Sequence, residues 1–178
     1  MGIKSKSWLR SLSILVSVLT MLTLLIRIGQ WLRGRLKMTS SPTKAIQKTF
    51  KGTEFESLTP YVIAQAKHET GGYNTNVSKP LKYNNNMFGM NRPKTRITTD
   101  NGKGNLVVEG SVMANYDSLE DSARDLLLWL RQWKSSPFPT TITSAWQYAN
   151  ELKGANKGRL NYYEDSIDNY SKGLSAWL

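Results

Sequence analysis

The sequence has no cysteine among its 178 residues and only one histidine, His68. Disulfide frameworks, cysteine-ligated zinc, iron–sulfur clusters and thiol catalysis are therefore excluded. A Ser–His–Asp triad would have to use His68, and no G-x-S-x-G motif accompanies it. The sequence also has no phosphate-binding loop, dinucleotide fingerprint, EF-hand or zinc motif. We expect neither a cofactor nor a metal, which leaves carboxylates as the candidates for catalysis.

Acidic residues are missing from the first 40 positions, which carry seven basic residues. The whole chain has 24 basic and 13 acidic residues, so residues 41–178 hold 17 basic and 13 acidic ones. Most of the net charge of +11 therefore belongs to the N-terminal arm. A nucleic-acid-binding protein would instead concentrate positive charge on its folded domain, so we expect no nucleic-acid partner.

An uncharged run rich in Leu, Val and Ile spans residues 11–26 and continues, with one arginine, to residue 32. A helix over 11–26 would reach about 24 Å, whereas a helix over 11–32 reaches about 33 Å and spans a hydrocarbon core of about 30 Å. Residues 11–32 therefore predict a transmembrane signal-anchor helix, with Arg27 extending toward the headgroups. This interpretation makes a lipid bilayer one partner of the chain.

A cleavable signal peptide is the alternative, but the segment after the apolar run is basic and lacks an Ala-x-Ala-like site. We therefore divide the chain into a basic segment at 1–10, the anchor at 11–32, a basic and polar linker at 33–42 and a domain at 43–178. Similar numbers of basic residues flank both ends of the anchor, so the positive-inside rule does not decide its topology.

The domain at 43–178 alternates amphipathic helical patterns with one strand-rich stretch. Helices are predicted at 43–51, 59–70, 118–133, 143–152 and 161–178. Residues 84–90 predict a short helix or turn. Two strands, at 96–100 and 105–114, are predicted on either side of a Gly-rich hairpin. The expected fold class is α+β: a mostly helical domain with a small β-hairpin lobe, preceded by one N-terminal transmembrane helix.

Glu69 is the notable carboxylate. It lies close to the C-terminal end of the helix predicted at 59–70, just before Gly71 and Gly72. The negative end of the helix dipole and apolar neighbours both raise the pKa of a carboxyl group in that place. A glutamic acid that stays protonated near neutral pH is what general acid catalysis needs.

Three short motifs occur in an order that resembles a known family. AQAKHETG at 64–71 is followed by NNMFGM at 85–90 and ANYDS at 114–118. This order is similar to the glucosaminidase domain of bacterial autolysins and flagellar wall-cutting proteins, glycoside hydrolase family 73 of the lysozyme-like superfamily. The resemblance covers about residues 43–178. It implies a lysozyme-like fold and hydrolysis of the β-1,4 bond after N-acetylglucosamine in peptidoglycan glycan strands.

The resemblance also implies roles for individual residues. It gives Glu69 the role of general acid and implies a second carboxylate on the hairpin lobe, where Asp100 stands; Glu109 on the returning strand is the alternative. Tyr116 is implied to orient the acetamido group of the sugar or the acid. Four more residues are candidates for substrate binding, although the first two equally suit a helix cap: Asn85, Asn86, Tyr162 and Tyr163.

Other activities remain open on the same motifs. A lytic transglycosylase also uses one glutamate but forms an anhydro sugar, and a muramidase cuts the other β-1,4 bond. A catalytically inactive, membrane-anchored structural or wall-binding protein is an alternative of another class. We expect a single-pass membrane protein whose C-terminal domain faces the cell wall. It would serve autolysis, phage lysis or phage entry, and a virion membrane is the alternative location if it serves entry.

Overall fold

The structure is a computed structural model that describes residues 21, 41–154 and 157–178. The chain divides into two units, Met1–Thr39 and Ser40–Leu178, and all but one of the described residues belong to the second. The predicted transmembrane helix at 11–32 lies outside the described residues, apart from Met21. Within the described part of the chain, no helix is both long and apolar enough to cross a membrane.

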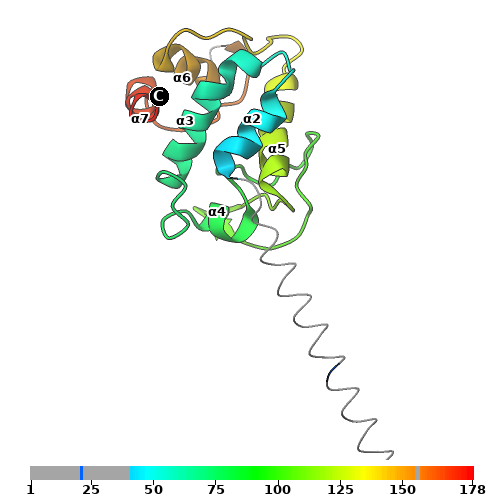
Figure 1. Cartoon of the computed structure of the whole chain (residues 1–178). Helices are drawn as coiled ribbons and strands as arrows, with labels where there is room; N and C mark the ends of the chain where they lie inside the picture. The colour runs from blue at the N-terminus through cyan, green and yellow to red at the C-terminus, as the bar shows by residue number, and fades with distance from the viewer. Residues whose placement is uncertain (1–20, 22–40, 155–156) are drawn as a thin grey trace, which may run out of the picture. The chain divides into compact units, whose positions relative to one another are not determined.

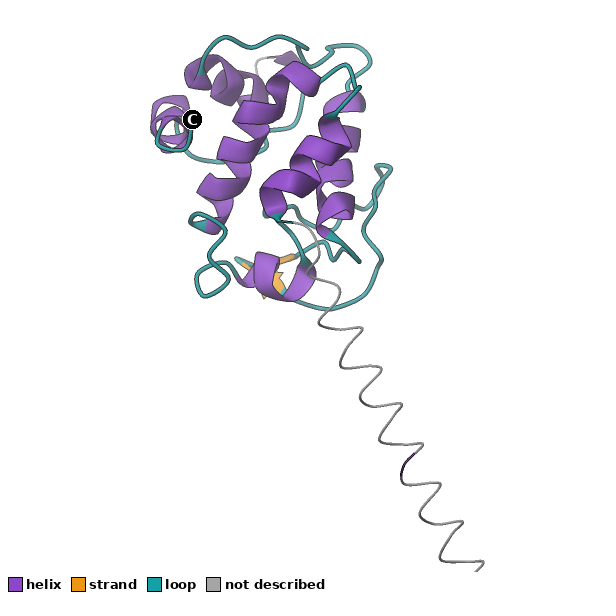
Figure 2. Ribbon diagram, in the orientation of Figure 1, coloured by secondary structure: helices purple, strands orange, loops and turns teal. Residues whose placement is uncertain are grey.

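The second unit is mostly helical and carries one small antiparallel sheet, which confirms the α+β class (Figures 1 and 2). A short 3-10 helix, η1 (Glu56–Leu58), precedes α3, and the two strands pair with each other. The described elements in chain order are α2 (Pro42–Phe50), η1, α3 (Thr59–Thr70), α4 (Lys79–Asn84), β1 (Val107–Val108), β2 (Ser111–Val112), α5 (Leu119–Arg131), α6 (Ala145–Lys153) and α7 (Ile167–Ser175).

Serine side chains begin most of these helices. The hydroxyl of an N-cap serine accepts a hydrogen bond from a backbone N–H of the first turn in five of them, which satisfies a donor that the helix itself cannot pair. The five caps are Ser41, Ser78, Ser118, Ser144 and Ser166. Helix α3 is different because η1 leads directly into it, and the Thr59 hydroxyl donates to the carbonyl of Glu56.

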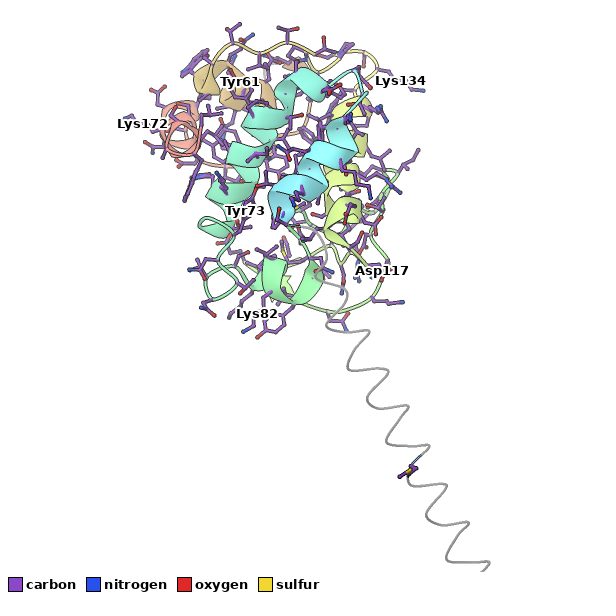
Figure 3. All side chains as sticks on the ribbon, in the orientation of Figure 1. Tyr61, Tyr73, Lys82, Asp117, Lys134 and Lys172 are labelled. Carbon is purple, nitrogen blue, oxygen red and sulfur yellow. The ribbon has the colours of Figure 1, made fainter. Side chains whose placement is uncertain are left out.

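The core lies where α3 meets α2 and α7, with α5 against α2 and α6 against α7. Figure 3 shows Lys82 on α4 and Asp117 near one end of this unit, and Tyr61 and Lys134 near the opposite end. The residues that fill the core are fully or almost fully buried, among them Ile46, Phe50, Leu58, Val62, Phe88, Leu126, Leu130, Tyr148 and Leu174.

The hairpin is shorter than predicted and sits elsewhere in the chain. Its turn is formed by Glu109 and Gly110, with φ of +49° and +79°, as in the type I′ turns that join two-residue hairpins. The prediction of a strand at 96–100 and a turn at 101–104 is therefore wrong. The apolar run Leu106–Val108 pairs with the residues directly after it, so the earlier segment is left without a strand partner.

The segment that was expected to form the first strand is instead fixed by ion pairs. Arg96 makes a bidentate contact with the buried carboxylate of Asp125 on α5, at 2.7 and 2.6 Å. Arg92 pairs with Asp100 at 2.8 Å. Because these charge-assisted bonds satisfy the polar groups of the loop, it stays ordered without a β ladder.

Helix α7 begins six residues later than the sequence predicts. Residues 161–166 form a loop, and Ser166 caps the helix through the backbone N–H of Asn169. This loop places Tyr162 and Tyr163 in the lining of the cleft that Glu69 of α3 also lines.

Candidate active site

Glu69 lies in the last turn of α3 because the chain reverses directly after it. Gly71 and Gly72 have φ of +61° and +77°, which side-chain-bearing residues rarely adopt. The N–H of Gly72 donates to the carbonyl of Lys67 at 2.8 Å and ends the helix. The carboxyl group is thereby held at the helix C-terminus, partly buried, on the wall of a cleft.

The Glu69 carboxyl group has one direct partner among the described side chains. The hydroxyl of Tyr170 on α7 donates to Oε1 at 2.5 Å. Burial raises the pKa of Glu69 to about 6, and the Tyr170 hydrogen bond, which favours the charged form, moderates the rise. Glu69 is therefore an acid whose pKa lies closer to neutral pH than that of an exposed glutamate, and the cause is burial.

The loop opposite Glu69 is organised by the two candidate asparagines. Asn85 adopts φ of +50° as the C-cap of α4, and its side chain donates to the carbonyl of Tyr116 at 2.9 Å. Asn86 is fully buried and bonds the backbone of Met90 through both side-chain atoms, at 2.8 and 3.0 Å. Both side chains thus serve the backbone, which favours the capping interpretation over sugar binding.

This loop brings Gly89 to the Glu69 carboxyl group. A β-carbon on Gly89 would lie 3.6 Å from Oε2 of Glu69, and the residue has φ of +61°. Because Gly89 has no side chain, none covers Oε2 at this position, whereas Oε1 accepts from Tyr170.

The cleft beside Glu69 has a volume of about 660 Å³. Two more carboxylates line it, Glu109 from the hairpin turn and Glu164 from the loop before α7. The cleft is therefore bounded by α3, the 85–90 loop, the hairpin and the 161–166 loop. Its other lining residues include Val77, Ser78, Phe88, Asn91, Met113 and Asn161.

Tyr162 and Tyr163 both line this cleft, as their assignment as substrate-binding residues requires. The Tyr162 hydroxyl donates to the carbonyl of Phe88, so it also fixes the residue before Gly89. Burial and the nearby Glu69 charge hold the pKa of Tyr162 well above its usual value. Tyr163 donates to the carbonyl of Ala149 at 3.0 Å, and its ring stacks on Tyr170 with 3.9 Å between centroids.

Asp100 and Tyr116 are not among the residues lining the Glu69 cleft. One oxygen of Asp100 accepts from Arg92, and the other accepts from the backbone N–H of Asn115 at 2.8 Å. The Tyr116 hydroxyl donates to Asp125 at 2.7 Å, and the ring is 1% exposed. Both side chains stabilise the loop between α4 and α5.

Sequence reasoning missed Tyr170 and Glu164. Tyr170 reaches Glu69 across 101 positions of the chain, and a helical pattern marks it only as a core residue of the last helix. Glu164 follows the two tyrosines directly, but the sequence placed it inside that helix. In the described part of the chain, no cluster of three or more His, Asp or Glu side chains is arranged to hold a metal ion.

Comparison of the sequence with known protein families gives one match. Residues 47–176 match the glucosaminidase family, described as mannosyl-glycoprotein endo-beta-N-acetylglucosaminidase. The chain belongs to the glucosaminidase family. No curated protein and no solved structure matches it.

Membership of the glucosaminidase family makes the chain a glycoside hydrolase that acts on peptidoglycan. The match extends from α2 to α7 and therefore includes every side chain that lines the Glu69 cleft. The family and the geometry agree on the class of chemistry, because glycosidases use carboxyl groups placed along an open cleft.

Proposed function

We propose that this chain is a membrane-anchored endo-β-N-acetylglucosaminidase that cleaves the β-1,4 bond after N-acetylglucosamine in peptidoglycan. The observation that carries the proposal is Glu69, an acid with a pKa of about 6 on the wall of a cleft of about 660 Å³. A carboxyl group with this pKa is partly protonated near neutral pH, as a general acid must be.

Tyr170 determines which oxygen of Glu69 carries the proton. Because the Tyr170 hydroxyl donates to Oε1, the acidic proton of the neutral form resides on Oε2. Oε2 faces the space left by Gly89. In this geometry Glu69 protonates the glycosidic oxygen from Oε2 while the C1–O bond breaks, and the leaving sugar departs with that proton.

Glu109 is our candidate for the second carboxylate, in preference to Asp100. Glu109 is exposed and lines the same cleft as Glu69, from a turn that the hairpin holds in place. The Asp100 side chain is 5% exposed, and both of its oxygens are already bonded. We propose that the oxygen of a water molecule bonds to C1 while one of its protons passes to Glu109. Glu109 then releases that proton to solvent and Glu69 takes one up, which restores both carboxyl groups.

A pair of substitutions separates these two carboxylates. We expect Glu109→Gln to lower kcat by about 100-fold or more while leaving the melting temperature unchanged, since a general base contributes roughly that factor. Asp100→Asn should instead lower the melting temperature, because it weakens the bond to Arg92, and should affect kcat less. A catalytic loss confined to Asp100→Asn would overturn the assignment of Glu109.

The reaction itself is tested by digesting purified peptidoglycan with the full-length chain and identifying the new ends by mass spectrometry. New reducing N-acetylglucosamine ends that vanish with Glu69→Gln would support the proposal. Reducing N-acetylmuramic acid ends would indicate a muramidase, and anhydro-muramic ends a lytic transglycosylase. A folded chain that releases no product would favour a wall-binding or structural role.

Residues 11–32 supply the proposed membrane anchor, since their composition fits a bilayer-spanning helix better than a cleavable signal. The linker at 33–42 spans at most about 35 Å when fully extended. The enzyme would then cut only the glycan strands closest to the membrane. This restricted reach suits autolysis as well as phage entry or lysis.

A further inference from the structure

A second, smaller arm adjoins the Glu69 cleft, which forms the first arm. It has a volume of about 310 Å³ and shares Gly89, Asn91, Asn161 and Tyr162 with the first. We call it the basic arm because Arg92, Lys94 and Arg96 line it, and no acidic residue lines it among the described residues. The first arm has the opposite character, with Glu69, Glu109 and Glu164 along its wall.

The carboxylates that pair with the two arginines lie behind the wall of the basic arm. The Asp125 side chain is 0% exposed and that of Asp100 is 5% exposed, and neither lines the arm. The cations therefore lie between these carboxylates and the cleft. A positive electrostatic potential in a partly desolvated cleft attracts negatively charged ligands.

Lys94 is the cation that remains available. It is exposed, and it makes no hydrogen bond or ion pair with any residue in 41–154 or 157–178. Gln132 adds a side-chain amide to the arm, and Leu160, which is 71% exposed, adds an apolar surface. The arm thus offers a free ammonium group beside neutral polar and apolar groups.

We propose that the basic arm binds a carboxylate carried by the muramic acid unit beside the cleaved bond, with Lys94 as its direct partner. The inference rests on the proposed function, because it takes peptidoglycan as the substrate. Every muramic acid residue bears a lactyl group, and this group ends either in its own carboxylate or in a peptide that carries carboxylates.

The opposite charges of the two arms would also set the direction of the strand. A carboxylate entering the first arm would meet Glu109 and Glu164, and like charges at close range oppose binding. The same group in the basic arm is attracted. The substituted sugar is therefore expected on the basic side of Glu69, and the unsubstituted N-acetylglucosamine on the acidic side.

Binding can be measured without cleavage. The full-length chain carrying Glu69→Gln, in detergent, would be co-sedimented with insoluble peptidoglycan freed of phosphate polymers. Lys94→Gln is added to this parent, and Lys51→Gln serves as the matched control, since Lys51 is exposed and lines neither arm. The same variants are tested on peptidoglycan whose carboxylates are converted to neutral methylamides, and on glycan stripped of its peptides.

We expect Lys94→Gln to weaken binding to untreated peptidoglycan by about two- to fivefold, the range for one exposed charge pair. Lys51→Gln should leave it unchanged, and the loss at Lys94 should vanish on the amidated substrate. A loss that persists on peptide-free glycan assigns the lactyl carboxylate, and a loss that disappears there assigns the peptide carboxylates.

Equal binding of parent and Lys94→Gln, an equal loss on amidated substrate, or no binding by the parent would overturn the proposal. These outcomes are distinct from failure of the proposed function, which is judged by the products that the unsubstituted chain releases.

Discussion

Two opposing effects act on the proton of Glu69. Burial disfavours the carboxylate and raises the pKa to about 6, while the Tyr170 hydroxyl donates to Oε1 and favours the carboxylate. Burial is the larger effect, so the neutral acid persists to higher pH than on an exposed glutamate. The Tyr170 bond therefore tunes the acid and positions it at the same time.

Tyr170→Phe removes the effect that lowers this pKa. The pKa of Glu69 should then rise above about 6, so the protonated acid survives to higher pH. The alkaline limb of the kcat/KM profile, which reports loss of the acid in the free enzyme, should move to higher pH. A full pH profile of peptidoglycan hydrolysis, with the reducing ends counted, measures this shift.

Tyr73→Phe is the matched control for this experiment. The Tyr73 hydroxyl accepts from Thr43 at 3.3 Å, and its side chain does not line the Glu69 cleft. The alkaline limb of the kcat/KM profile of Tyr73→Phe should coincide with that of the unsubstituted chain. A limb that stays in place with Tyr170→Phe, or moves to lower pH, would show that Tyr170 does not act on the proton of Glu69.

At the scale of elements, the contact between α3 and α7 places Tyr170 beside Glu69. Gly173 permits this contact, since a β-carbon there would lie 2.3 Å from Cε1 of His68. The His68 ring instead packs edge-on against Tyr170, with 5.0 Å between centroids. The single histidine of the chain is thus a packing residue that supports the position of Tyr170.

Gly173→Ala sets two effects against each other. Alanine in a helix interior is favoured over glycine by about 0.5–1 kcal/mol. The clash with His68 is an overpacking defect, which typically destabilises by about 1–3 kcal/mol. We expect the clash to dominate, so the melting temperature and the activity should both fall.

The double variant His68→Ala/Gly173→Ala tests the cause. Without the imidazole ring the clash disappears, and only the helix preference of alanine remains. The double variant should therefore be more stable than His68→Ala alone in thermal unfolding. If Gly173→Ala remains destabilising in the His68→Ala background, the close approach of α7 has another cause.

The sequence predicts some elements better than others for physical reasons. Helix α5 was predictable because its signals are local: Ser118 accepts from the N–H of Asp121, and an apolar face follows. The hairpin was misplaced because the two glycines at 102 and 104 suggested a turn there, whereas the ladder between 107–108 and 111–112 places the turn at Glu109 and Gly110. The Tyr170–Glu69 bond is set by tertiary packing, which no local pattern encodes.

The same distinction applies to the site. Glu69 could be singled out from the sequence because its signals are local: a helix end, two glycines and the AQAKHETG motif. Asp100 and Glu109 could not be separated in the same way, since their exposure depends on Arg92, Asn115 and the hairpin turn. Our proposal for Glu109 rests on which of the two side chains the fold leaves exposed to the cleft.

At the scale of the whole molecule, the catalytic domain needs one membrane orientation, and the charges flanking the proposed anchor do not fix it. The domain must face the wall to reach peptidoglycan. The apolar run is preceded by Lys4, Lys6 and Arg10 and followed by a slightly larger number of basic residues, so its flanks do not enforce that orientation. The orientation has to be measured.

The lack of cysteine makes this measurement direct, because one introduced thiol reports on one site. Ser7→Cys lies before the predicted span, and Gln47→Cys lies on the exposed face of α2. In spheroplasts treated with a membrane-impermeant maleimide, we expect Gln47→Cys to react at once and Ser7→Cys only after lysis. The labelled chain should keep its full mass of 20.1 kDa and remain in the membrane fraction.

Labelling of Ser7→Cys alone would place the domain on the cytoplasmic side, and a shortened soluble product would identify residues 11–32 as part of a cleaved signal. Either result would remove the proposed limit on reach, since that limit requires both an intact anchor and an external domain.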